Sequence, residues 1–482
     1  MKKTLTALCL LGILTLQAQQ NNSLLSQDFW RNNPTIEELK MAIDKGNSPT
    51  ETNAMHMDPA TLAINSNASA DIIKLLLSQK GIDINRPLHE QRTYLHWATM
   101  RGNTEVISYL ISKGANIHQK DDHELTPLAL ALNAGTCKKE IIELYFKAGL
   151  NPQTSYADGA NLLLMVAPYD KDMELTNYLL SKGISLQSKD TNGANAADYA
   201  ARKGNIGMIQ ALQQKGVKLT NNALLMAAQG TRRDANTVDV FNYLIDGQKL
   251  SPAVKDKEGN TLLQLVAKKQ KQEEVAAYLI SKGVPVNAAT ANGETALTMA
   301  MAYGSSSMVA LLLDNKADIN VVDKKGYNLT HYLMQSFRAA GSRGGMRGGP
   351  GAPSAGMAPP NNGSPAKDEF AEKMKILQDR NFNLIASQKD GSTILHYAAT
   401  AGDLALVKKV VAMGVNLNAQ NDDGMTALVK AASTAKDDKV LRYLVEAGAD
   451  KTLKTSFDES AYDLVKNNEN FKKNNIDIEF LK

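Results

Sequence analysis

Short blocks of apolar residues at helical spacing run along most of the chain, and glycines separate them. Residues 388–420 show the pattern most clearly. In their first block the apolar positions fall at i, i+3, i+4 and i+7, and these are Leu395, Ala398, Ala399 and Gly402. A second block follows with Val407, Val410 and Val411. Each block predicts a helix of about three turns, which is too short to be stable alone in water. The helices must therefore bury their apolar faces against neighbours.

The same pair of blocks recurs along the chain, and two columns of glycines mark its period. The first column lies in a polar turn before each pair and holds Gly159, Gly193, Gly259, Gly293, Gly326, Gly391 and Gly424. The second column closes each pair and holds Gly81, Gly114, Gly149, Gly183, Gly216, Gly283, Gly414 and Gly448. Several separations within the first column are 33 or 34 residues. Two columns with one period predict a stack of helical hairpins.

Specific residues in each unit point to a known repeat. Thr393-Ile394-Leu395-His396 opens the first helix, where the Thr393 hydroxyl is expected to cap the helix. Related tetrapeptides begin at Thr93, Thr126, Thr295 and Thr426. With the alanine pair Ala398-Ala399 and the ending Val410-Val411…Gly414, the unit resembles the ankyrin repeat. The resemblance implies an all-α ankyrin-repeat solenoid of about eleven helix-turn-helix units, with short projecting turns and capping half-repeats.

The repeat pattern divides the chain into six segments. They are a signal peptide at 1–18, an N-terminal extension with a capping helix at 19–53, repeats at 54–340, an insertion at 341–366, further repeats at 367–455, and a C-terminal capping partial repeat at 456–482. The unit at 222–255 is irregular, with a shortened turn and a long loop between its helices. The insertion interrupts another unit, and its Gly, Pro, Ser, Ala and Met composition predicts disorder.

The N-terminus predicts export. Lys2 and Lys3 precede an apolar run that ends at Leu16, and Ala18 is a small residue suited to cleavage. The run is too short to span a bilayer as a mature helix. We therefore expect a periplasmic or secreted bacterial protein with no membrane span in the mature chain.

The charge balance limits the classes of partner. The chain holds 54 Lys and Arg against 50 Asp and Glu, a formal net charge of +4, which falls to +2 without Lys2 and Lys3. This argues against nucleic acid or an anionic membrane as the partner. Residues 343–349, Arg-Gly-Gly-Met-Arg-Gly-Gly, resemble an RNA-binding tract. In an exported chain of near-neutral charge we interpret them as part of a flexible soluble loop, and we expect the protein to be monomeric.

The histidines and acidic residues that first suggest chemistry have simpler interpretations. His96, His331 and His396 hold the fourth position of the tetrapeptide, where the resemblance implies hydrogen bonds to the adjoining turn. Residues 121–124, Asp-Asp-His-Glu, lie at a turn and are interpreted as a solvated turn rather than a metal site. No phosphate-binding glycine loop and no nucleophile elbow occur in the sequence.

The mature chain would keep one cysteine, Cys137, so no intramolecular disulfide is expected. The neighbouring Lys138 and Lys139 would lower the pKa of its thiol. No paired histidine with an orienting carboxylate is identifiable near it, so a nucleophilic role is not expected. We predict no enzyme activity, no cofactor and no metal.

The resemblance implies a scaffold that binds another protein, here in the bacterial envelope, through turn tips and the concave inner-helix surface. The candidate contact residues, chosen as exposed by pattern, are Asp122, His123, Asn192, Lys257, Glu258, Asn292, Lys324, Lys325, Lys389, Asp390 and Asp423. Two alternatives stay open. One is a protective or assembly factor for a periplasmic enzyme linked to catalase or haem. The other is a carrier of a small ligand or metal.

Overall fold

The computed structural model describes residues 22–231, 234–337 and 368–482. The expected signal peptide (1–18) and the insertion (341–366) lie outside the described residues. Within those three ranges the chain consists of helices and short connections, with two isolated β-bridges and no strand. The predicted all-α class is confirmed. The chain divides into two compact units, one holding residues up to Ala200 together with 207–218, the other holding 201–206 together with 219–482.

The first unit is a series of helix pairs. We call the first helix of each pair inner and the second outer. The inner helices are α1 (Gln27–Arg31), α3 (Pro59–Asn65), α5 (Tyr94–Arg101), α7 (Pro127–Ala134), α9 (Leu162–Val166) and α11 (Ala196–Ala200). The outer helices are α2 (Ile36–Asp44), α4 (Ala70–Leu77), α6 (Thr104–Ser112), α8 (Lys139–Lys147), α10 (Glu174–Ser181) and α12 (Ile206–Gln214). Each inner helix packs on the next inner helix, and α2, α4, α6 and α8 pack in the same way.

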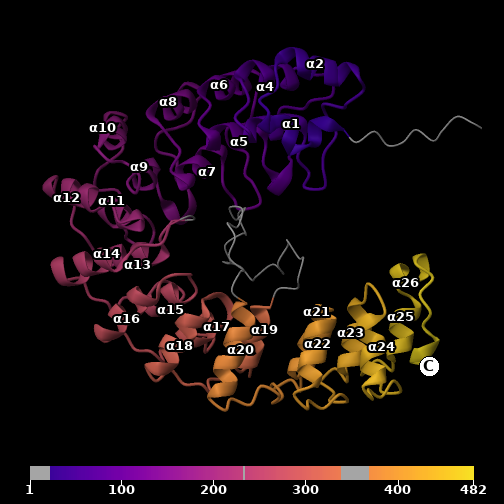
Figure 1. Ribbon diagram of the computed structural model, residues 1–482. Helices are drawn as coiled ribbons and strands as arrows, with labels where there is room; N and C mark the ends of the chain where they lie inside the picture. The colour runs from indigo at the N-terminus through magenta and orange to yellow at the C-terminus, as the bar shows by residue number, and fades with distance from the viewer. Residues whose placement is uncertain (1–21, 232–233, 338–367) are drawn as a thin grey trace, which may run out of the picture. The chain divides into compact units, whose positions relative to one another are not determined.

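The second unit continues the same pattern. Its inner helices are α13 (Asn222–Gln229), α15 (Leu262–Ala267), α17 (Ala296–Tyr303), α19 (Leu329–Gln335), α21 (Ile394–Ala401), α23 (Ala427–Thr434) and α25 (Ala461–Lys466). Its outer helices are α14 (Val238–Asn242), α16 (Glu273–Ser281), α18 (Ser306–Asp314), α20 (Glu369–Asp379), α22 (Leu404–Val411), α24 (Lys439–Glu446) and α26 (Glu469–Lys473). Figure 1 shows α21, α23 and α25 in one row, with α22 and α24 in a second.

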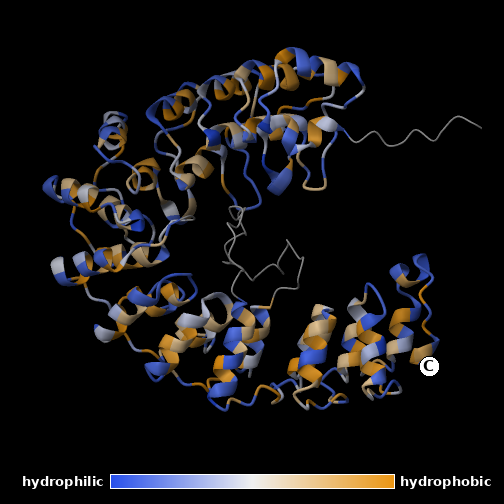
Figure 2. Cartoon of the chain, in the orientation of Figure 1, coloured by the Kyte–Doolittle hydropathy of each residue, from blue (hydrophilic) through white to orange (hydrophobic). Residues whose placement is uncertain are grey.

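Small residues let the inner helices approach one another closely. In α21 the alanines Ala398 and Ala399 are buried, and Leu395 beside them is fully covered. The outer helices contribute longer side chains such as Val407 and Val410 of α22, which are also fully buried. The outer helix α22 thus carries buried apolar residues and exposed lysines around its axis, as expected of an element with one buried face (Figure 2). The inner helix α9 is apolar throughout. The core runs between the two rows of helices instead of forming one central cluster.

Helix α20, which follows the insertion, packs against α18 and α19. Lys373 of α20 is 1% exposed, and its ammonium group donates to the carbonyl of Met301 over 2.9 Å. Two carboxylates of the same helix reach α18, where Glu369 accepts from the Ser306 N–H at 2.5 Å and Glu372 from the Ser306 hydroxyl at 2.6 Å. These bonds attach α20 to the preceding pair of helices.

The N-terminal part of the described chain holds a short helix that the apolar pattern did not reveal. Helix α1 precedes the expected N-terminal helix, and the Trp30 indole in it is 1% exposed and donates to the Leu24 carbonyl over 2.8 Å. Its five residues are too few for a periodic pattern.

In the irregular pair at residues 222–255, a π-helix (Tyr243–Gly247) follows α14 directly. Residues 232 and 233 of the long loop before α14 lie outside the described part of the chain.

Candidate protein-binding surface

A short polar turn, which we call a tip, precedes most inner helices. At its first residue a backbone N–H donates to the carbonyl four residues later, as from Asp323 to Tyr327 at 3.0 Å. The side chain of the same residue accepts from the backbone N–H groups two and four positions on, at 2.9 Å each for Asp323. The residues that accept in this way are Asp121, Asp190, Asp256, Thr290, Asp323, Asn421 and Thr455. One side-chain acceptor therefore shapes each of these seven tips.

Backbone hydrogen bonds join neighbouring tips. In the second unit Lys324 donates its N–H to the Asn292 carbonyl at 2.9 Å, and Lys389 donates to Gly326 at 3.2 Å. Asp422 donates to Asp390, and Ser456 donates to Asp423, both at 2.8 Å. Because these bonds use only main-chain atoms, they require no particular side chain at Lys324, Lys389, Asp422 or Ser456.

Six of the predicted contact residues lie on this linked row of tips. They are Asn292, Lys324, Lys325, Lys389, Asp390 and Asp423. Five are exposed, but Asp390 is half-buried, and its carboxylate accepts from the Ser392 N–H at 3.0 Å and from the Ser392 hydroxyl at 3.1 Å. The prediction that Asp390 is simply exposed was therefore wrong, because the side chain stabilises its own turn. Lys257 and Glu258 are exposed on the tip that begins at Asp256.

The remaining candidates lie on tips of the first unit. Asn192 is exposed, and so are Asp122 and His123, where the Asp122 N–H donates to the Glu90 carbonyl at 3.1 Å. The interpretation of residues 121–124 as wholly solvated was wrong at Asp121, which is 4% exposed. Its carboxylate accepts from the Arg92 Nε at 2.9 Å. A buried guanidinium thus offsets a buried carboxylate and anchors the tip.

Two of the three motif histidines make the bonds that the resemblance implied. The His96 Nδ1 accepts from the Thr93 N–H at 3.1 Å, and its Nε2 lies 3.1 Å from the Leu125 carbonyl of the next tip. His396 repeats this with Thr393 at 3.0 Å and Met425 at 2.9 Å. Thr393 is the N-cap of α21, as expected, and forms a capping box with His396. Its hydroxyl also lies 3.0 Å from the His396 Nδ1.

His331 does not make this pair of bonds. Its Nδ1 lies 3.2 Å from the Tyr397 hydroxyl and its Nε2 lies 2.8 Å from the Gln335 side-chain nitrogen. The ring stacks on Tyr327 with 4.0 Å between centroids and 7° between planes. Sequence reasoning missed this group of aromatic residues on the inner helices. In a chain with only 5% aromatic residues, tyrosines at half-exposed inner-helix positions were the signal that could have found it.

The Cys137 thiol donates to the backbone carbonyl of Lys138, with 3.8 Å between Sγ and the oxygen. Burial raises the pKa of its thiol to about 12, against the expectation that its lysines lower it. Lys138 is exposed, and the Lys139 ammonium lies over the Tyr178 ring, 5.3 Å from its centroid. Desolvation of the thiolate therefore prevails. Among the residues that the structure describes, no group of three or more His, Cys, Asp or Glu side chains is placed to hold a metal ion.

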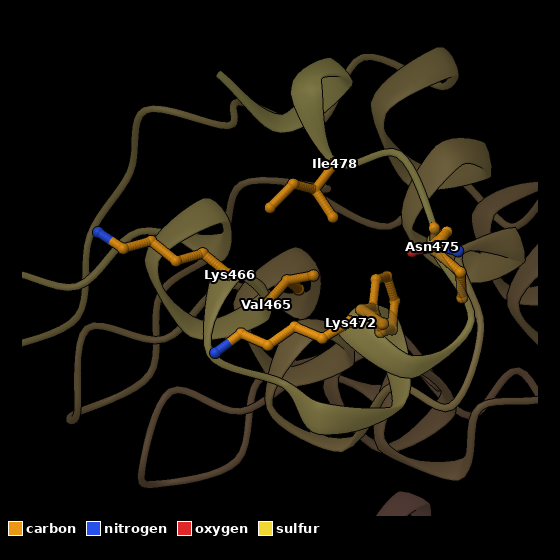
Figure 3. A pocket seen from close by; sticks show the side chains of 7 residues that line it. Val465, Lys466, Lys472, Asn475 and Ile478 are labelled. Atoms are coloured by element: carbon orange, nitrogen blue, oxygen red, sulfur yellow. The ribbon is translucent and has the colours of Figure 1, made fainter.

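A hollow of about 360 Å³ lies at the C-terminal end of the second unit (Figure 3). Its lining is Val465, Lys466, Phe471, Lys472, Asn475, Ile476 and Ile478. Figure 3 shows Ile478 across from Val465, with both lysine side chains extending away from these apolar walls. The lining therefore does not bring together a set of polar side chains that could act on a bound molecule.

No helix in the described ranges is both long and apolar enough to cross a membrane.

Comparison with protein families gives matches along most of the chain. A family model described as "Ankyrin repeats (3 copies)" matches residues 30–121, 60–156, 224–323 and 366–455. A second model, "Ankyrin repeats (many copies)", matches residues 164–213.

Curated relatives match over shorter shares of their own length. The human transient receptor potential cation channel subfamily A member 1 is 22% identical over 416 residues, which cover 85% of this chain and 32% of the channel. A putative palmitoyltransferase, ZDHHC13 of Danio rerio, is 35% identical over 129 residues, 26% of this chain and 19% of the relative. The chain thus spans about a third or less of these relatives. Among solved structures, the ankyrin repeat domain of Bcl-3 is 19% identical with a TM-score of 0.35, covering 57% of this chain and 94% of that domain.

Proposed function

The chain belongs to the ankyrin-repeat family, and from this premise we propose that it is a scaffold that binds a partner protein in the bacterial envelope. Ankyrin repeats generally mediate protein–protein interaction, and the family is generally non-enzymatic. The partner would contact the exposed side chains of the tips and the inner-helix surface beside them.

One observation carries the proposal. In the second unit, successive tips are joined by main-chain hydrogen bonds from Asn292 to Ser456, while their outward side chains are exposed. Because the main chain of the tips is already held by these bonds, it loses little conformational freedom on binding, which favours affinity. The frame needs no particular outward side chain, so that these positions can serve recognition.

The envelope location rests on the sequence of residues 1–18. Two lysines followed by a short apolar run favour export through the inner membrane of a bacterium. Cell fractionation of the full chain and of a version without residues 2–18 tests this. We expect osmotic shock to release the full chain and to leave the shortened chain in the cytoplasm. Equal retention of both would reject export.

Crosslinking in cells tests the binding function. A tagged full chain would be crosslinked, captured and its partners identified by mass spectrometry. A matched variant carries Lys324→Glu, Lys325→Glu and Lys389→Glu on adjacent tips, and a control carries Lys40→Glu on α2. One dominant partner, reduced at least about tenfold by the tip changes alone, is the expected result. A capture that the tip changes leave intact would place recognition elsewhere on the chain.

A further inference from the structure

Four aromatic side chains from three consecutive inner helices and one tip form a continuous surface, which we call the aromatic patch. They are Tyr303 at the end of α17, Tyr327 in the tip before α19, His331 in α19, and Tyr397 in α21. Gln335 links them, because its Oε1 accepts from the Tyr303 hydroxyl at 3.3 Å and its Nε2 lies 2.8 Å from the His331 Nε2. Tyr303 is 46% exposed and the other three rings are half-buried.

His331 takes part in this patch because another residue replaces it in the framework. At the equivalent positions His96 and His396 accept the backbone N–H at the start of their helices. Here the Asn328 N–H donates instead to the Gln388 Oε1 at 2.8 Å, and the Gln388 Nε2 donates to the Asn328 Oδ1 at 2.9 Å. Gln388 therefore takes the place of the imidazole at the start of α19, which leaves His331 available for the patch.

The rings present both faces and edges. Tyr327 and His331 stack in parallel, with centroids 4.0 Å apart, while Tyr397 meets His331 edge-on at 5.5 Å and 72°. The Tyr397 hydroxyl, the Tyr303 hydroxyl and the Gln335 carbonyl oxygen add hydrogen-bonding atoms at the margins. An aromatic surface with polar margins is the composition typical of interface hot spots.

Carboxylates give this surface its charge preference. Burial raises the pKa of Tyr327 and of Tyr397, and the carboxylates of Asp390 and Asp323 raise both further. Glu294 acts in the same direction on Tyr303 after burial. One ammonium group, from Lys325, acts on His331, whose pKa burial lowers, and there Asp323 and Asp390 oppose it. Asp323, whose carboxylate accepts from the Tyr332 hydroxyl at 2.7 Å, and Asp390 thus lie near the rings, and their charge favours a cation over an anion there. The exposed Lys324, Lys325 and Lys389 on the same tips oppose them.

We propose that the aromatic patch binds an arginine side chain presented by the partner protein. A guanidinium stacks flat on an aromatic face and donates in its own plane to nearby oxygens, a role that the phenol and amide oxygens at the margins can fill. The Asp323 and Asp390 carboxylates already bond their own turns and would act through their charge. A lysine ammonium, as a compact and strongly hydrated charge, would use the flat faces less well. This inference rests on the proposed scaffold function and names the chemistry of its partner.

The test measures binding of a defined peptide to the full chain. Acetyl-Gly-Arg-Gly-amide is titrated by saturation-transfer NMR, and the same peptide with citrulline replacing arginine serves as the neutral isostere. We expect saturation of the arginine side-chain protons and binding at least about fivefold weaker for citrulline. No saturation at millimolar peptide, or equal binding of the two peptides, would overturn the proposal.

Variants assign the binding to the patch. Tyr327→Leu and Tyr303→Leu should each weaken arginine binding at least about fivefold, while Tyr327→Phe, which keeps the ring, should retain it. Tyr462→Leu, on α25, is the matched control, and urea unfolding verifies that every variant folds. Unchanged binding in Tyr327→Leu would reject the patch as the site. If the peptide binds only after residues 341–366 are deleted, the arginines of that segment occupy the patch in the full chain. That result would reject the proposal that the patch binds an arginine of a partner protein.

Failure of this inference and failure of the proposed function can be told apart. If crosslinking captures the same partner with the wild-type chain and with Tyr327→Leu, the result supports the scaffold function and rejects the arginine contact. If crosslinking captures no partner while the peptide still binds the patch, the patch assignment stands and the envelope scaffold falls.

Discussion

At the scale of single residues, identical positions in the repeat do different work. His96 and His396 are buried and bridge two turns, whereas His331 lies among aromatic rings. The difference comes from one neighbour, because Gln388 satisfies the backbone group that a histidine satisfies elsewhere. The motif therefore identifies equivalent positions in the repeats, but the neighbouring residues determine which contacts the side chain makes.

The buried histidines predict a loss of stability in mild acid. Burial lowers the pKa of His96 and of His396 below the ordinary 6.5, and Nδ1 must stay unprotonated to accept its backbone bond. The unfolded chain binds the proton more readily, so the free energy of unfolding should fall as the pH drops below about 6.5. Urea titrations at pH 7.5 and 5.5 measure this change. His96→Gln should reduce it, while His118→Gln at an exposed site should not.

The ion pair beneath the tip at residues 121–125 predicts a large effect of one substitution. Arg92 is buried, bonds Asp121 at 2.9 Å and also lies 2.5 Å from the Glu90 carboxylate. Arg92→Ala leaves the Asp121 carboxylate buried without its partner, so we expect the free energy of unfolding to fall by about 3–5 kcal/mol. Lys120→Ala, which removes an exposed pair with Glu124, should cost less than about 0.5 kcal/mol. Comparable losses in the two would contradict this account of the tip.

At the scale of elements, close approach of main chains sets the packing of the inner helices. At Gly304, after α17, an added Cβ would collide with the Ala267 carbonyl at the end of α15. Its φ of −80° is one that any residue adopts, so the glycine is required for space and not for conformation. The approach of α15 and α17 therefore depends on this missing methyl group.

Gly304→Ala should consequently destabilise the second unit by about 1–3 kcal/mol, because backbone must move to admit the methyl group. Gly247→Ala is the matched control, since its added Cβ would meet only the Tyr243 ring at 3.8 Å, an ordinary contact. Chemical unfolding followed by circular dichroism compares the two variants. A tolerated Gly304→Ala would show that the two helices can separate without cost.

The helix pairs were predictable from the sequence, but several contacts were not. Periodic apolar positions such as Leu395 and Val407 report burial directly, so α21 and α22 follow from pattern alone. The five residues of α1 show no period, and its burial depends on packing against α3. Asp121 and Asp390 read as solvent-exposed because polarity does not distinguish a solvated carboxylate from one that bonds its own turn. The aromatic patch joins residues up to 94 positions apart, from Tyr303 to Tyr397, which only the folded chain brings together.

At the scale of the whole molecule, each unit is a linear series whose stability is a sum over neighbours. In the last pair, α25 packs on α23, which would otherwise expose an apolar side, and α26 packs on α25. Phe471 of α26 is 2% exposed, and Leu481 near the C-terminus is 1% exposed. The C-terminal residues therefore protect the end of the second unit.

Deletion of residues 456–482 should lower the Tm of the second unit by about 5 °C or more and promote association between molecules, because the side of α23 that packs on α25 becomes exposed to water. Deletion of residues 341–366, a stretch poor in large apolar residues, should change the Tm by less than about 2 °C. Calorimetry and light scattering compare the two. A C-terminal deletion that leaves both readings unchanged would mean that α25 and α26 contribute nothing to the stack.

Most tips are built from main-chain bonds and one inward acceptor. The residues that fix the backbone of such a tip are therefore different from the residues that would determine which partner it binds. Asp323 accepts the backbone bonds that shape its tip, whereas Lys324 and Lys325 contribute only main-chain atoms to it and can be exchanged without altering it. A combinatorial library randomised at the outward positions alone would therefore keep one backbone while sampling many surfaces. In such a library a new partner is acquired by substitution at the tips, with no remodelling of the helices beneath.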